Sequence, residues 1–92
     1  MHRYPELSNP QNILVECADG GDIDTETVMS LLDLAESTAS NYLRGLYGRG
    51  YLKRKNVHAH TKSGGPRYQY ALTSEGRKKV VWIKTKILKQ PA

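Results

Sequence analysis

Cysteine is almost absent from this 92-residue chain, and long apolar runs are absent altogether. The single cysteine, Cys17, can form neither an internal disulfide nor a cysteine-rich zinc site. The longest unbroken apolar run, residues 80–83, is far shorter than the ~20 residues of a membrane helix. No apolar stretch of secretory type stands near the start. These absences predict one small soluble domain, and we expect it in the cytoplasm.

Acidic residues are scarce as well, but only in the second half of the chain. Residues 1–43 carry eight acidic residues and one basic residue, a net charge of −7. Residues 44–92 carry thirteen basic residues and Glu75 as the single acid, a net charge of +12. Positive charge gathered in one half is typical of a surface that binds a polyanion, although a solvated basic face would have the same composition. Charge alone leaves both interpretations open.

Local sequence signals place the first helix. Residues 1–7 show no period and are expected to be a tail, and Ser8 with Gln11 forms the capping-box pattern of a helix start. The helix ends at Gly20, where two glycines follow each other. Cys17 falls on its apolar face, so we expect a small core residue. A redox-sensing thiol is the alternative, which burial in apolar surroundings disfavours.

Two further helices follow at short intervals. Residues 22–24 form a short extended link, and Asp24 can cap a second helix that ends near Leu32. A third helix is predicted over 36–47, because its apolar residues return at helical spacing before two closely spaced glycines end it. These signals indicate a compact group of helices in the acidic half.

The period then changes to that of strands. Residues 51–60 are rich in β-compatible side chains and bases, 62–66 form a turn cluster, and 68–72 alternate as a half-buried strand does. A last helix is predicted over 74–89, followed by a short tail at 90–92. The sequence therefore predicts one domain over residues 8–89.

The order helix, short strand, helix, tight turn, helix, two-stranded hairpin, helix resembles a winged helix-turn-helix domain. Similar sequence patterns occur in the small winged-helix regulators of the MarR, PadR and ArsR types, and the similarity covers about residues 8–88. The segments that carry it are 28–43, Leu46, 50–52 and 68–77. The resemblance implies an α+β fold, mostly α, with a three-helix core, a two-stranded β-hairpin wing and a C-terminal helix.

Three residues depart from the pattern of those regulators. Met29 stands where a small residue is usual, Asp33 where the turn usually has glycine, and Ala35 where a hydroxyl cap is usual. Aspartate tolerates a left-handed turn, and the missing cap costs about 1 kcal/mol. We therefore expect the fold to hold and the angle between the second and third helices to be affected.

One face of the helix over 36–47 is built of short polar groups. Opposite its apolar stripe lie Ser37, Thr38, Asn41, Arg44, Gly45 and Gly48. Such a face can enter a major groove closely, where Asn41 can pair with adenine and Arg44 with guanine or phosphate. We expect base-reading contacts from Ser37, Thr38, Asn41 and Arg44, the alternative being a solvated face.

The predicted hairpin and its surroundings supply cations for phosphate groups, which add affinity but little sequence information. The residues expected to make these contacts are Ser40, Arg49, Lys53, Arg54, Lys55, Lys62 and Arg67. His58 and His60 could ligate a metal, but no nearby carboxylate or thiol completes a site. We expect no metal and no other cofactor.

The C-terminal helix has more apolar surface than one small domain needs. Val80, Ile83 and Ile87 form one stripe, and Val81 with Leu88 forms a second beside it. A homodimer interface is expected from Val81, Trp82, Ile83, Ile87 and Leu88. In the alternative, Trp82 lies over its own domain or is simply exposed.

These patterns favour a sequence-specific regulator of transcription that binds double-stranded DNA, with helix 36–47 in the major groove and hairpin 51–72 as the wing. The resemblance implies a repressor that occupies a promoter. We expect the protein in the cytoplasm, associated with the nucleoid. The alternative is a winged-helix module that binds protein or RNA without reading DNA sequence. An enzyme is disfavoured because no Ser/His/acid set occurs, and a small-molecule effector is not expected because no effector domain fits the length.

Overall fold

Four helices and a hairpin follow one another in the computed structural model, which describes residues 2–57 and 67–90. The elements are α1 (Asn9–Gly20), α2 (Thr25–Leu32), α3 (Glu36–Gly48), β1 (Leu52–Val57), β2 (Arg67–Leu72) and α4 (Ser74–Lys86). Their order is the predicted one. His58, His60 and Lys62 lie outside the described residues. Within those two ranges, no helix has the length and apolar character that a membrane crossing requires.

The first two helices begin at the predicted caps. The Ser8 hydroxyl accepts a hydrogen bond from the backbone N of Gln11 at 3.3 Å, and the Gln11 side chain accepts one from the backbone N of Ser8 at 3.0 Å. Asp24 caps α2 by accepting from the backbone N of Thr27 at 2.9 Å. α1 ends against Gly21, whose φ of 90° is a conformation that glycine adopts without strain. The predicted capping chemistry is confirmed at both helix starts.

The turn between α2 and α3 contains two of the unusual residues. Asp33 adopts a left-handed conformation, with φ 55° and ψ 54°, as expected for a residue that replaces glycine there. Ala35 occupies the N-cap position of α3 without a side-chain hydrogen bond. The turn therefore forms with Asp33 and Ala35 in the positions where related regulators usually have glycine and a hydroxyl residue. The first turn of α3 has no side-chain cap.

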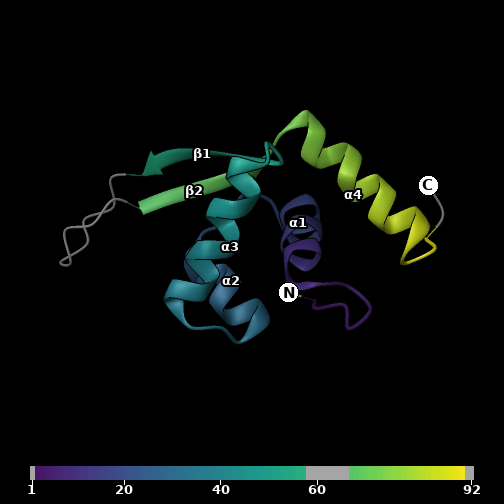
Figure 1. Cartoon of the computed structure of the whole chain (residues 1–92), viewed down its shortest axis with the longest axis horizontal. Coiled ribbons are helices and arrows are strands. Elements are labelled where there is room, and N and C mark those ends of the chain that lie inside the picture. Colours follow the sequence, from purple (N-terminus) through teal and green to yellow (C-terminus); the bar gives the residue numbers. More distant parts are fainter. Residues whose placement is uncertain (1, 58–66, 91–92) are drawn as a thin grey trace.

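The antiparallel hairpin has two chemically different faces. In its register Leu52 lies opposite Leu72, and Arg54 lies opposite Tyr70. Ile23, in the predicted extended link, adds a bridge to Tyr70 with backbone hydrogen bonds of 2.9 and 2.7 Å. The hairpin thereby joins the helical part, and in Figure 1 it extends away from α4, with α1 between α3 and α4.

The core lies where α1, α3, α4 and the base of the hairpin meet. Its fully buried large side chains are Ile13, Leu14, Val15, Val28, Leu43, Leu52 and Ile83. Residues 2–7 form no helix, but they are not a free tail: Leu7 is buried, and Tyr4 packs against the core. Buried Asn12 fastens them, accepting from the backbone N of Tyr4 at 2.7 Å and donating to its carbonyl at 3.0 Å. Sequence periodicity missed this contact because residues 2–7 have no regular secondary structure.

Cys17 is a core residue, as predicted, and its thiol lies 3.8 Å from the carbonyl oxygen of Tyr70. Burial, with Asp22 nearby, raises the pKa of the thiol to about 11. Because only the thiolate reacts readily, we expect alkylation of Cys17 at pH 8 to be far slower in the folded protein than in urea. Mass spectrometry after timed iodoacetamide treatment measures both rates, and equal rates would contradict the burial of Cys17.

Candidate nucleic-acid interface

The outward face of α3 carries the four residues that the sequence singled out for base reading. The inward face, formed by Ala39, Leu43 and Leu46, is buried against the core. The outward face is exposed and consists of Ser37, Thr38, Asn41, Arg44, Gly45 and Gly48. Space is open around Gly45, with no side chain or neighbouring element within 4 Å of where a Cβ would lie. A partner can therefore approach the backbone of α3 closely at that position.

Asn41 and Arg44 contact each other on this face. A terminal nitrogen of the Arg44 guanidinium donates a hydrogen bond to the amide oxygen of Asn41. They lie three residues apart, so both side chains project from the same side of the helix. Beside them is an open hollow of about 480 Å³, lined by Glu36, Ser37, Ser40 and Arg44. The pair thus presents an oriented guanidinium and an amide at one edge of a polar surface.

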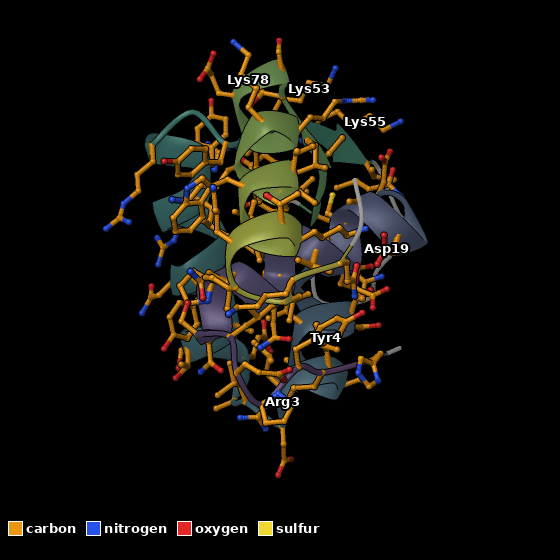
Figure 2. The ribbon with its side chains drawn as sticks, turned by 90° about the vertical axis from the view of Figure 1, so that its right-hand side faces the viewer. Arg3, Tyr4, Asp19, Lys53, Lys55 and Lys78 are labelled. Carbon is orange, nitrogen blue, oxygen red and sulfur yellow. The ribbon has the colours of Figure 1, made fainter. Side chains whose placement is uncertain are left out.

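The hairpin divides the predicted phosphate-binding cations between its two faces. Strand alternation places Arg54 on the same face as buried Leu52, Tyr70 and Leu72, the face that packs toward the helices. Lys53 and Lys55 are exposed on the opposite face. In Figure 2 both lysines lie at the same end of the molecule as Lys78 of α4. The structure therefore does not bring these lysines together with Arg54.

Arg54 is engaged by two aromatic rings. The central carbon of its guanidinium lies 4.2 Å from the ring centroid of Tyr47, at the end of α3, and 4.2 Å from that of Tyr68 on β2. A hydrogen bond with Tyr70 raises the pKa of Arg54 above its already high usual value. Arg54 is therefore permanently charged, and its side chain joins both strands to α3.

Arg67 is also engaged, at the outer end of β2. Its guanidinium donates a hydrogen bond to the carboxylate of Glu26, in the first turn of α2, and the two form an ion pair. Both side chains are largely exposed, so the pair adds little stability and can open. In the structure, therefore, the Arg67 guanidinium is bound by a carboxylate of α2. Arg49, exposed at the end of α3, has no ion-pair partner among the described residues.

Three functional candidates escaped the sequence interpretation, namely Tyr47, Tyr68 and Glu26. Arg54 follows the apolar residue Leu52 by two positions, and in a strand this spacing places both side chains on the same face. This spacing is the signal in the sequence that could have shown Arg54 on the inward face. The partners of Arg54 and Arg67 come from α3 and α2, which are distant in the chain. Only the folded arrangement identifies those partners.

The C-terminal helix exposes part of its predicted dimer surface. Val81 and Trp82 are 58% and 45% exposed, and Ile87 and Leu88 are half-buried against the core. Ile83, by contrast, is fully buried within its own domain, so its assignment to the dimer surface is wrong. The helix ends at Lys86, three residues before the predicted end, with Ile87 as its C-cap.

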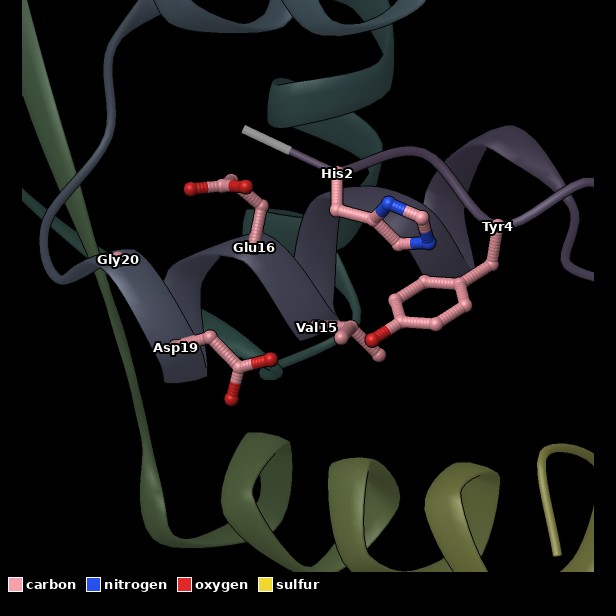
Figure 3. A pocket seen from close by; sticks show the side chains of 6 residues that line it. All are labelled: His2, Tyr4, Val15, Glu16, Asp19 and Gly20. Atoms are coloured by element: carbon pink, nitrogen blue, oxygen red, sulfur yellow. The ribbon is translucent and has the colours of Figure 1, made fainter. Parts of the chain in front are cut away.

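A second hollow lies between α1 and the N-terminal residues. Its volume is about 370 Å³. Figure 3 shows the residues that line it, which are His2, Tyr4, Val15, Glu16, Asp19 and Gly20. Asp19 accepts a hydrogen bond from Lys84 of α4 at 2.6 Å. The carboxylates make this surface unsuited to a polyanion. No group of three or more metal-ligating side chains occurs in residues 2–57 and 67–90.

Comparison with solved structures identifies the architecture. ZitR of Lactococcus lactis is similar over 91% of this chain and 60% of that chain, with 14% identity and a TM-score of 0.71. The chain has the winged helix-turn-helix fold. The regulator Tm0710 of Thermotoga maritima is similar over 90% of this chain and 58% of that chain, with 22% identity and a TM-score of 0.66. The predicted resemblance to MarR-type regulators is thus confirmed for the fold.

A MarR mutant of E. coli was solved in complex with operator DNA. It is similar over 89% of this chain and 59% of that chain, with 13% identity and a TM-score of 0.69. The winged-helix domain spans about three-fifths of the length of these three proteins. No family model and no curated protein sequence matches the chain.

Proposed function

We propose that this winged-helix domain is a sequence-specific regulator of transcription that binds double-stranded DNA through α3. The observation that carries the proposal is the exposed face of α3, where Asn41 and Arg44 are surrounded by short polar side chains and glycine. Bulky side chains would hold a helix away from the base edges, and this face has none between Ser37 and Arg44. Operator DNA in the MarR mutant complex supports the assignment by similarity of fold.

Asn41 and Arg44 are the proposed base-reading pair, with Ser37 and Thr38 beside them. An amide can bind adenine through two hydrogen bonds, and a guanidinium can bind guanine in the same way. Their mutual hydrogen bond holds Arg44 in place before DNA arrives. The Asn41 amide oxygen has a second lone pair and the amide nitrogen has its own hydrogens, so Asn41 can bind adenine while it still accepts from Arg44. The two residues therefore act on neighbouring bases as a unit.

Phosphate contacts are proposed from cations and one hydroxyl at the rim of this face. Half-buried Ser40 lies in α3 and Arg49 is the C-cap of α3, and Arg67 can exchange Glu26 for a phosphate. Lys62 belongs to the same proposed set and lies outside the described residues. Lys53 and Lys55 share a hairpin face with Arg67 but lie nearer the base of the hairpin, so we assign them smaller effects.

We further propose that two copies associate through the exposed residues of α4 and repress transcription by occupying a promoter in the nucleoid. Val81 and Trp82 form the centre of this surface, with Ile87 and Leu88 at its edge. One recognition helix contacts only a few base pairs, and a two-fold axis doubles the contacts. A self-complementary apolar surface is a common basis for such a dimer.

Selection of bound duplexes from a random pool tests the function directly. We expect one enriched site, and an affinity whose logarithm falls with log salt at a slope near −4 if about four phosphates are neutralised per chain. Asn41→Ala should reduce discrimination between this site and random duplex by about tenfold or more, because each bidentate base contact contributes about 1–3 kcal/mol.

Lys53→Ala is the matched control, since it removes an exposed polar side chain from the hairpin face that lies away from α3. It should preserve the preference for the selected site. Absence of duplex binding at low salt would contradict the proposal. A random RNA pool is selected in parallel, and enrichment from that pool without enrichment of a duplex would favour the RNA-binding module.

A further inference from the structure

We propose that Tyr47, Arg54 and Tyr68 form an aromatic–cation clamp that sets the orientation of the wing relative to the recognition helix. In this arrangement Arg54 is a positioning residue and does not itself bind phosphate. The consequence for DNA rests on the proposed function. The clamp itself is a property of the free protein and can be measured without DNA.

The clamp joins three elements through one side chain. Tyr47 lies in the last turn of α3, Arg54 in β1 and Tyr68 in β2. The Arg54 guanidinium carbon is 4.2 Å from each ring centroid, well inside the ~6 Å range of a cation–π contact. A single cation therefore fastens both strands of the wing to the helix that carries the proposed base-reading residues.

The outer hairpin needs such a link because its own packing decreases quickly along its length. Leu52 and Leu72 are buried at the base, whereas Lys55, Asn56 and Val57 are exposed further out. At the base, the backbone N of Tyr51 donates to the carbonyl of Leu46 at 3.1 Å. Beyond Leu52, strand β1 contacts α3 through Arg54, whereas β2 is tied at Tyr70 to Ile23 and at Arg67 to Glu26 of α2. The clamp therefore adds the link between the wing and the recognition helix, which the other two ties do not supply.

The surroundings of Arg54 distinguish it from the other cations of the hairpin. Its guanidinium lies over two rings and its side chain is half-buried, whereas Lys53 and Lys55 are exposed on the opposite face. Tyr47 lies at the surface, with 41% of its side chain exposed. Arg54 covers part of the Tyr47 ring.

A clamped wing should raise DNA affinity without adding a contact to DNA. When only a fraction of the free molecules holds the binding orientation, the apparent affinity falls by that fraction. Two exposed cation–π contacts are sufficient to change such a population by about tenfold. The salt dependence should stay the same, because the number of neutralised phosphates does not change.

Five variants, with Arg54→Met as the loss of charge at position 54, test the clamp against a phosphate contact. Arg54→Lys keeps the charge but loses the flat guanidinium, and Tyr47→Leu removes one ring. Each weakens only part of the clamp, so we expect each to weaken duplex binding about threefold at an unchanged salt slope. Tyr47→Phe keeps the ring and should bind like the parent chain. Lys55→Met, a matched loss of charge on the same strand, should leave the wing orientation unchanged.

Residual dipolar couplings of backbone amides in the free protein measure the orientation of β1 and β2 relative to α3. We expect Tyr47→Phe to reproduce the parent couplings and Tyr47→Leu and Arg54→Lys to change those of the hairpin alone. Unchanged hairpin couplings in Tyr47→Leu would overturn the clamp. So would a changed orientation with parental DNA affinity, or a salt slope lowered by about one in Arg54→Met.

The two measurements separate this inference from the proposed function. If the parent chain binds no duplex, the proposed function fails, and the couplings of the free protein still decide whether the clamp holds the wing. If the parent chain binds duplex and the hairpin couplings do not respond to Tyr47→Leu, the clamp fails and the function stands.

Discussion

Gly76→Ala is expected to destabilise the domain by about 3 kcal/mol, a large share of the stability of a chain this size. Gly76 lies in the first turn of α4, where an added Cβ would stand 2.1 Å from the carbonyl oxygen of Tyr51 and 3.0 Å from the Leu72 side chain. The Tyr51 carbonyl cannot easily move, because it accepts a hydrogen bond from the backbone N of Thr73 at 3.1 Å. Urea unfolding followed by circular dichroism measures the loss.

Gly45→Ala is the matched control, the same substitution in another helix. No side chain or neighbouring element lies within 4 Å of its added Cβ, and alanine is the better helix former by about 1 kcal/mol. We expect this variant to be slightly more stable than the parent chain and to bind duplex DNA less tightly, since the new methyl group stands on the exposed face of α3. Equal stability of Gly76→Ala and the parent chain would show that α4 does not approach Tyr51 this closely.

Ile83→Asp is expected to unfold the domain at room temperature. Ile83 is fully buried in the core, so the variant loses its apolar contacts and places a carboxylate where no water reaches it. The combined cost of about 5 kcal/mol or more is comparable with the whole stability of a 92-residue domain. Loss of the far-ultraviolet helical signal in the absence of denaturant provides the measurement.

Val81→Asp, two residues earlier on the same helix, is the contrasting variant. Val81 is 58% exposed, so we expect the variant to fold like the parent chain and to lose self-association in sedimentation equilibrium. A parent chain that is monomeric at tens of micromolar, or a Val81→Asp variant that remains dimeric, would contradict the proposed dimer surface. A stably folded Ile83→Asp variant would contradict the packing of α4 on the core.

In the hairpin, the sequence predicted the strands but not the direction in which each basic side chain points. Period-two alternation correctly predicts a half-buried strand over residues 68–72, and β2 begins within one residue of that range. The same alternation applied to β1 separates Arg54 from its two lysine neighbours, yet charge composition groups all three as phosphate contacts. Charge is a property of the residue type, whereas the direction of a side chain depends on which strand face packs on the helices.

The sequence by itself determined the elements and their order, because caps, glycines and periodicity act over a few neighbouring residues. Ser8 and Asp24 begin their helices and Asp33 makes its left-handed turn as predicted. Tertiary structure alone decided the partners of Arg54 and Arg67, the burial of Ile83 and the docking of residues 2–7. Each of these depends on surfaces from segments far apart in the chain, and such surfaces become neighbours only when the core forms.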